Sequence, residues 1–165
     1  MGALQDYGRA TIAGDTTYGN YATIGGGCDN AANGDYASIL GGNRNVTSGT
    51  GAGVISGRGN FAGGPGGDAV VAGGYANTAY GSSAAVGGGT GNYVFADEAC
   101  VPGGRADTAG ASYSFATNYH SVVGGPFTNS ACFNSEYVTA PNDPPMPVLL
   151  AQTMQLRTTG EAVTV

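Results

Sequence analysis

Acidic residues are the side chains in this sequence best suited to acid–base chemistry. Glycoside hydrolysis needs two carboxyl groups roughly 5 to 9 Å apart. Asp97 and Glu98 form the only adjacent acidic pair, and Asp29 and Asp35 are expected on the turns of one repeat unit. Because nothing in the sequence places these carboxylates in a cleft, we interpret them as solvated turn residues. A polysaccharide-cleaving enzyme is the alternative.

Other catalytic and ligand-binding patterns are absent from the sequence. His120 is the only histidine, and no Gly-x-Ser-x-Gly motif surrounds a serine, so a hydrolytic triad is not favoured. Cys28, Cys100 and Cys132 show no Cys-x-x-Cys spacing, which argues against a zinc site. The sequence therefore predicts no catalytic, cofactor-binding or metal-binding residue.

A repeat that begins with alanine and places an aliphatic residue two positions later organises the chain. Successive starts, from Ala22 to Ala99, are separated by 15, 15, 17, 15 and 15 residues. A fixed period of this length is typical of a chain that winds coil upon coil. The aliphatic residues are the predicted core: Ile24, Ile39, Val54, Val71, Val86, Val101 and, after a shorter step at 114–121, Val123.

A polar residue returns at a second fixed position, eight residues after each start. We predict that these side chains form a ladder in which each amide bonds to the next. Its members are Asn30, Asn45, Asn60, Asn77, Asn92, Asp107 and Asn129. Glycine pairs before the ladder residues allow tight bends. Each coil is thus expected to hold two short strands and two turns, which predicts an all-β parallel β-roll or β-solenoid.

The composition and charge of the chain indicate which classes of binding partner it can have. The 165 residues include 32 glycines, no lysine and five arginines, and the net charge is −6. Scattered arginines in an acidic chain argue against nucleic-acid binding, and no apolar run is long enough to span a membrane. One Val or Ile per coil buries little apolar surface, so we expect identical chains to associate laterally about a common axis, intertwined or side by side, in a homo-assembly.

The repeat also predicts the domain organisation. We expect an N-terminal lead-in at 1–9, the β-roll at 10–132, a proline-rich linker at 133–147 and a short hairpin-like closing segment at 148–165. The 17-residue coil contains 63–68, a glycine-rich segment expected to form a bulged turn.

The most variable part of each repeat is the pair of residues before the ladder position. Variation within a rigid repeat marks solvent-facing turns, where a receptor or glycan could be contacted. The candidate surface contacts in these pairs are Arg44, Arg58, Tyr75 and Arg105.

The repeats at 22–36 and 69–83 resemble the head repeats of trimeric autotransporter adhesins and, more closely, the Gly-Gly-x-x-Asn-x-Ala-x-Gly arrays of phage tail fibres. The tail at 154–160 resembles the segment that closes such arrays. The resemblance implies a left-handed trimeric β-roll in an extracellular or virion tail fibre, with a role in rigid reach and attachment to a host surface. Three alternatives stay open: a bacterial adhesin head, a self-assembling filament subunit and a tailspike depolymerase.

Overall fold

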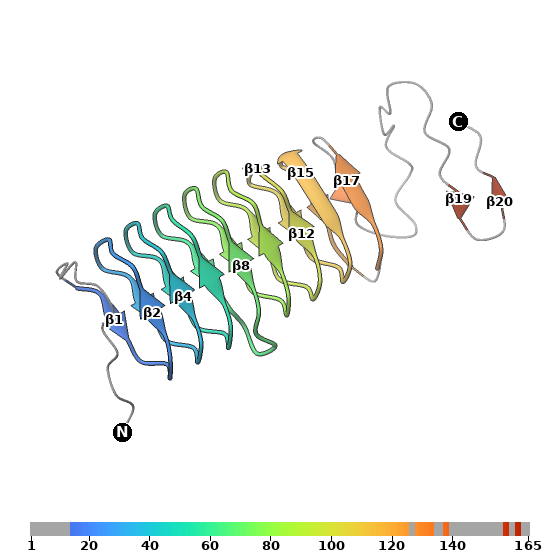
Figure 1. The fold of residues 1–165 in the computed structure, drawn as a ribbon. Helices are drawn as coiled ribbons and strands as arrows, with labels where there is room; N and C mark the ends of the chain where they lie inside the picture. The colour runs from blue at the N-terminus through green and yellow to red at the C-terminus, as the bar shows by residue number, and fades with distance from the viewer. Residues whose placement is uncertain (1–13, 126–127, 134–136, 139–156, 159–160, 163–165) are drawn as a thin grey trace.

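The computed structural model describes residues 14–125, 128–133, 137–138, 157–158 and 161–162. Residues 14–138, apart from the gaps, form a parallel β-solenoid with coils of about 15 residues, as the repeat predicts (Figure 1). The lead-in at 1–9 and most of the predicted linker lie outside the described residues.

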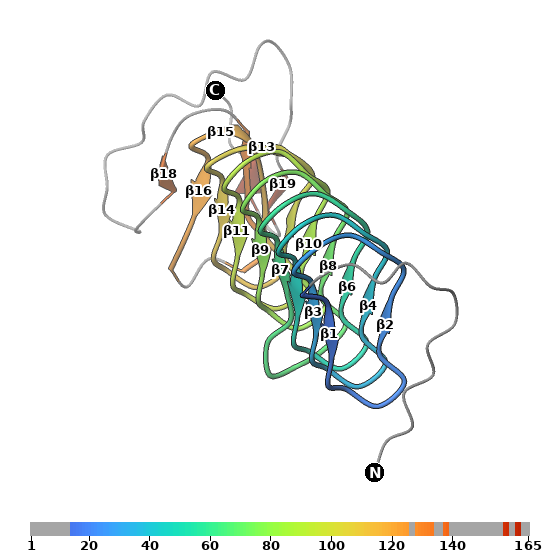
Figure 2. The same ribbon diagram turned by 90° about the vertical axis from the view of Figure 1, so that its left-hand side faces the viewer.

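Each coil contributes a short strand to each of two parallel sheets, which run side by side along the solenoid (Figure 2). The first sheet consists of β1 (Thr16–Thr17), β3 (Ala31–Ala32), β5 (Val46–Thr47), β7 (Phe61–Ala62), β9 (Thr78–Ala79), β11 (Tyr93–Val94), β14 (Thr108–Ala109), β16 (Val122–Val123) and β18 (Tyr137–Val138). Since β18 pairs with β16, this sheet continues past residue 132, where the repeat was expected to end.

The second sheet is built mainly from the strands at the coil starts. It consists of β2 (Thr23–Ile24), β4 (Ser38–Ile39), β6 (Gly53–Val54), β8 (Val70–Val71), β10 (Ala85–Val86), β12 (Cys100–Val101), β15 (Phe115–Tyr119), β13 (Gly104–Arg105) and β17 (Ala131–Phe133). Both β13 and β17 pair with the longer β15. Separately, β19 (Arg157–Thr158) and β20 (Glu161–Ala162) pair antiparallel within the predicted closing segment.

Four columns of small side chains fill the space between the sheets. Alternation along each two-residue strand turns one side chain inward and one outward. Ile39, Val54, Val71, Val86 and Val101 are buried in one column, and Ile24 at the end of the stack is partly exposed. The starting alanines, the second residues of the first-sheet strands and the ladder residues fill the other three columns. The core is therefore broader than the aliphatic column alone.

Val123 is buried but lies in a different column from the one predicted. It belongs to β16 and pairs with Ala109 on the first sheet. Ala116 takes the place after Val101, because Phe115 pairs with Cys100. Ser114 thus starts a coil and the pattern at 121–125 belongs to the opposite strand, so the predicted short step at 114–121 was wrong.

The ladder residues bond mainly to the backbone. The backbone N–H of Asn45 donates to Asn30 Oδ1 at 3.0 Å. The side-chain Nδ2 of Asn45 donates to the backbone carbonyl oxygens of Gly41 at 3.1 Å and Gly57 at 2.9 Å. Bonds from one side chain to the next are added at Asn60 and Asn77, at 3.2 and 3.3 Å. Each asparagine thus connects three successive coils, with its Oδ1 and Nδ2 both used.

Both ends of this ladder differ from the prediction. Asp15 begins it, accepting the Asn30 N–H at 2.6 Å, and Ser121 follows Asp107, donating its N–H to Asp107 Oδ1 at 2.7 Å. Asn129 is not a member. It is exposed, has φ 61°, and donates its N–H to the Ser112 carbonyl, which places it in a turn on the opposite edge.

Close stacking requires glycine at the bend before the ladder. Gly74 has φ +89°, and a Cβ added there would lie against the carbonyl oxygen of Gly89 in the next coil. A side chain at this position would push neighbouring coils apart, because the strand spacing of about 4.8 Å leaves no room for it.

Thr47 lies in a column whose other buried members are alanine and valine. Its hydroxyl has no hydrogen-bond partner among the residues that the structure describes. Thr47→Val is therefore expected to raise the free energy of unfolding by about 1 kcal/mol, because the desolvated hydroxyl is removed while the shape is kept. Thermal or urea denaturation measures this change. Thr78→Val, at an outward and partly exposed position, is the control and should have little effect.

Candidate functional site

The turn before the ladder forms one long edge of the solenoid, which we call the arginine edge. Its first residues are joined by successive parallel bridges, and its second residues have φ between 53° and 65° in every coil from Asp29 to His120. The edge comprises Cys28-Asp29, Asn43-Arg44, Arg58-Gly59, Tyr75-Ala76, Thr90-Gly91, Arg105-Ala106 and Tyr119-His120.

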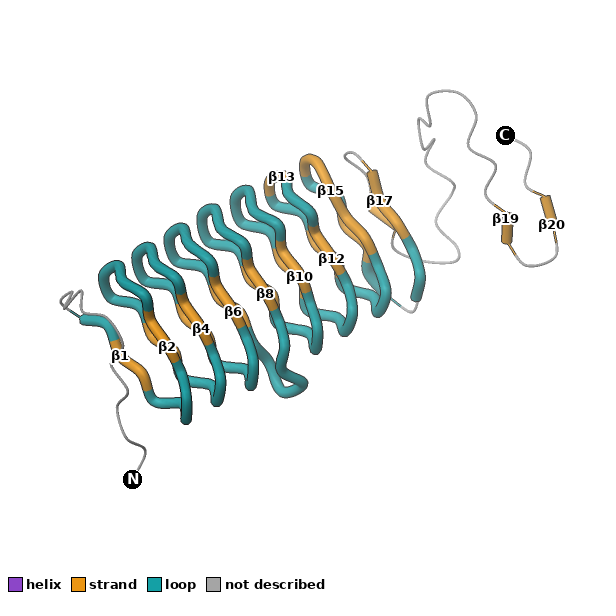
Figure 3. The backbone as a smooth tube through the Cα atoms, in the orientation of Figure 1, coloured by secondary structure: helices purple, strands orange, loops and turns teal. Residues whose placement is uncertain are grey.

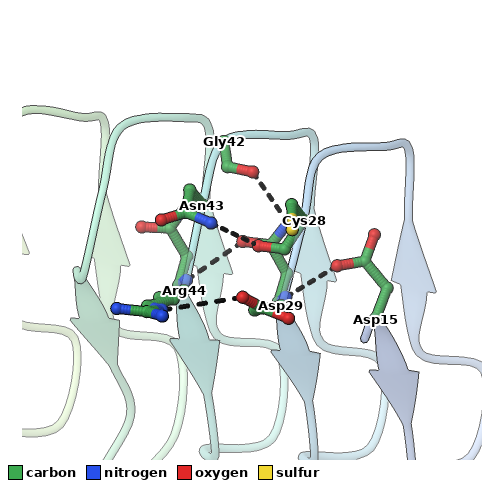
Figure 4. A network of polar contacts seen from close by, with 8 residues as sticks. Asp15, Cys28, Asp29, Gly42, Asn43 and Arg44 are labelled. Carbon is green, nitrogen blue, oxygen red and sulfur yellow. Dashed lines mark hydrogen bonds and ion pairs between the residues drawn. The ribbon is translucent and has the colours of Figure 1, made fainter. Parts of the chain in front are cut away.

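Backbone bonds hold this edge in register. The Cys28 N–H donates to the Gly42 carbonyl, and the Cys28 carbonyl accepts the Arg44 N–H at 2.9 Å and Asn43 Nδ2 at 3.1 Å (Figure 4). The same backbone bond recurs from Gly59 N–H to the Asn43 carbonyl and onward along the edge. Side chains on the edge are therefore displayed at regular intervals on a rigid backbone.

All four predicted surface contacts lie on this edge and are exposed. Arg58 lies 6.0 Å from the centroid of the Tyr75 ring, and Arg105 lies 5.9 Å from that of Tyr119. Arg44 Nε lies 3.6 Å from the Asp29 carboxylate, with both side chains about half exposed or more (Figure 4). Cation–π contacts leave the guanidinium charge available, so Arg58 and Arg105 are better placed than Arg44 to bind an external anionic group.

The turn before each starting residue forms the opposite edge, which we call the acidic edge. It carries Asp35, Asp68, Asp97 and Glu98 and, within residues 14–125, no basic residue. The three arginines of that same range all lie on the arginine edge. Asp29, beside Arg44 on the arginine edge, is the exception to this separation of acidic and basic side chains. The separation was not predicted, although the two positions before each start would have indicated it.

The acidic residues considered as a hydrolytic pair all lie on turns of the solenoid. Asp29 and Asp35 lie on opposite edges of the solenoid. Asp97 and Glu98 are both exposed on one turn, where Asp97 Oδ1 accepts the Ser82 N–H at 2.8 Å and the Glu98 N–H donates to the Ser82 carbonyl.

Burial acts on two of the three cysteine thiols. Desolvation, followed by the charge of Asp29, raises the pKa of the Cys28 thiol, and desolvation raises that of Cys100. A raised pKa lowers the thiolate fraction on which nucleophilic attack depends. Among the described residues, no cluster of three or more His, Cys, Asp or Glu side chains could hold a metal ion.

In the ladder, Asp107 lies between Asn92 and Ser121, and its carboxylate is buried. A Cβ added at Gly104 would meet Asp107 Oδ2 and the Asn118 carbonyl oxygen, just as one added at Gly89 would meet Asn92 Nδ2 and the Gly104 carbonyl oxygen. Asp107 Oδ2 thus occupies the place of an amide donor, and it has no hydrogen-bond partner in the part of the chain described. Burial raises the pKa of this carboxyl, although the Ser121 backbone N–H and the charge of His120 lower it.

Comparison with known proteins adds no relative. No family model, curated protein or solved structure matches the chain. Within the described residues, no helix has the length and hydropathy needed to cross a membrane.

Proposed function

We propose that this chain is a rigid, non-enzymatic segment of an extracellular or virion tail fibre, which associates laterally as a homotrimer and attaches to a host-surface glycan or receptor. The observation that carries the proposal is that Arg44, Arg58 and Arg105 lie on one edge of a straight stack of coils, whereas four acidic residues lie on the opposite edge (Figure 3). A stack of this kind provides reach, and the edges provide contact surfaces.

Complementary edges favour contact between neighbouring copies. Counted from Ala22, arginines lie on the second, third and sixth coils, and the acidic turns close the first, third and fifth coils. Consider two parallel copies whose equivalent coils are level with each other. Each arginine of one copy is then within about one coil, roughly 5 Å along the axis, of an acidic turn of the other copy. Because one edge meets the other, the interface is heterologous, and it closes into a ring when the rotation allows.

Charge reversal tests this association. Arg58→Asp with Arg105→Asp, or Asp68→Arg with Glu98→Arg, should each dissociate the assembly, because like charges then face each other across the interface. Combining all four substitutions should restore it. Sedimentation velocity measures the result, and raised salt should weaken the unmodified assembly. Unchanged association in both double variants would show that the edges are not the interface.

The attachment role is tested with a panel of capsular and cell-wall polysaccharides. We expect the protein to be retained on at least one polysaccharide and to release no new reducing ends from it. Tyr75→Ala should weaken retention without changing the mass of the assembly if the exposed aromatic turn of the arginine edge makes the contact. Release of reducing ends that depends on Asp97 or Glu98 would instead identify a depolymerase, and retention on none of the polysaccharides would contradict glycan attachment.

A further inference from the structure

The 17-residue coil breaks the regular row of turns on the acidic edge. Its extra length lies in 63–68, which projects below the even row of neighbouring turns (Figures 1 and 3). A Cβ added at Gly64 would meet the Tyr80 carbonyl, and one added at Gly66 would meet the Ser82 side chain. The projecting loop therefore lies directly over the following coil, which its glycines allow it to approach.

A small open hollow lies where this loop meets the first sheet. Pro65 and Gly66 form one wall, and Tyr80, Ser82, Phe95 and Asp97, from the two following coils, line the rest. Tyr80 is 43% and Phe95 is 45% exposed, so both aromatic side chains present substantial area to solvent. The loop at 63–68, the two aromatic rings and the Asp97 carboxylate lie close together because the loop is next to an aromatic part of the first sheet.

Neighbouring groups hold the two rings in place. The Tyr80 ring stacks on Phe61, with 6.3 Å between centroids and 21° between planes. Phe95 packs against Tyr93 at 5.6 Å, and a Cβ at Gly110 would strike the Phe95 ring. Packing on one side fixes each ring while leaving area for a ligand, which lowers the entropy that binding would cost.

The polar groups of the hollow are also fixed. Asp97 Oδ1 accepts the Ser82 N–H at 2.8 Å, and the Asp97 carbonyl accepts the Tyr113 N–H at 3.1 Å. The exposed carboxylate is thus held beside the rings, where it can accept hydrogen bonds from hydroxyl groups. The negative charge of the Asp97 carboxylate disfavours an anionic ligand in the hollow.

From this combination we propose that the hollow binds a neutral saccharide, whose apolar ring face packs on Tyr80 and Phe95 while its hydroxyls donate to Asp97. Two aromatic surfaces with a convergent acceptor provide the mixed apolar and polar contacts typical of small-ligand sites. The inference rests on the proposed attachment function and adds a ligand class. It also places a contact on the first sheet and acidic edge, away from the predicted residues of the arginine edge.

Saturation-transfer NMR with maltohexaose, cellohexaose and chitohexaose tests the proposal. We expect the full chain to bind at least one of them, and Phe95→Ala and Asp97→Asn to weaken that binding about tenfold, the equivalent of one lost contact of about 1.4 kcal/mol. Phe95→Leu keeps apolar packing over Gly110 without the ring, and should weaken binding similarly. The matched control is Tyr36→Ala. It removes an exposed aromatic ring that stacks on Tyr21, away from the hollow, and should leave binding unchanged.

The outcomes separate this site from the proposed function. Equal affinity in Phe95→Ala and the unmodified chain, binding of none of the three oligosaccharides, or tighter binding of an alginate hexamer would overturn the neutral-saccharide site. If polysaccharide retention nevertheless persists and depends on Tyr75, attachment stands and uses the arginine edge. If the unmodified chain is retained on no polysaccharide, the attachment function itself fails.

Discussion

Asn60→Ala is expected to lower the free energy of unfolding by about 3 kcal/mol. The substitution removes the bonds from Nδ2 to the carbonyl oxygens of Ser56 and Gly74, at 3.1 and 3.0 Å, and the acceptor of the Asn77 N–H. An unpaired buried amide costs about 1 to 3 kcal/mol by itself, and the lost Nδ2 bonds add to it. Urea denaturation followed by circular dichroism measures the change.

Asn43→Ala is the matched control for this effect. Asn43 is the same residue type, but it lies on the partly exposed arginine edge, where its side chain bonds to Cys28 and Nδ2 donates to the Cys28 carbonyl. Water can replace that bond, so we expect a loss below about 1 kcal/mol. Equal losses in the two variants would contradict the structural role assigned to the buried ladder.

Asp107→Asn is expected to stabilise the protein by about 2 kcal/mol at pH 7. The substitution restores a donor where Asp107 Oδ2 lacks a partner among the described residues, and it removes a buried charge. Restoring the donor should complete the ladder between Asn92 and Ser121. Thermal and urea denaturation of the two proteins at pH 7 measure the difference.

The pH dependence of this difference follows from the raised pKa of the Asp107 carboxyl. Between the unfolded pKa, about 3.9, and the higher folded pKa, the folded state binds more protons, so stability falls as pH rises. The penalty is then fully present above the folded pKa. The advantage of Asp107→Asn should therefore shrink as pH falls towards 4. Asp35→Asn, at an exposed carboxylate, is the control, and an advantage that grows on acidification would contradict the assignment.

The fold was predictable because one residue type recurs at one position in each coil. Alanine, valine and asparagine columns have different roles, yet all require the same 15-residue period, so the sequence pattern and the stacking agree. Where Ser114, Ala116 and Ser121 replace the usual residues, this agreement is lost. The triplet at 121–123 resembles a coil start because apolar alternation occurs on both strands of a coil. Val123 and Asn129 were consequently placed in the wrong columns.

The candidate contacts were only partly predictable. The residues Arg44, Arg58, Tyr75 and Arg105 share an offset or adjacent offset within the repeat, so their common edge follows from the period. The hollow at Tyr80 and Phe95 does not, because it depends on how far the loop at 63–68 reaches over the next coil. How far the loop extends depends on the backbone conformation at its glycines, and the spacing of the repeat does not determine that conformation.

The mass of the full chain in solution tests lateral association through complementary edges most directly. Native mass spectrometry, supported by sedimentation velocity at physiological salt, should give a single species with the mass of three chains. An open-ended series of masses would contradict the trimer and favour a filament. A monomer that stays intact across the concentration range would contradict the lateral association on which the proposed fibre depends.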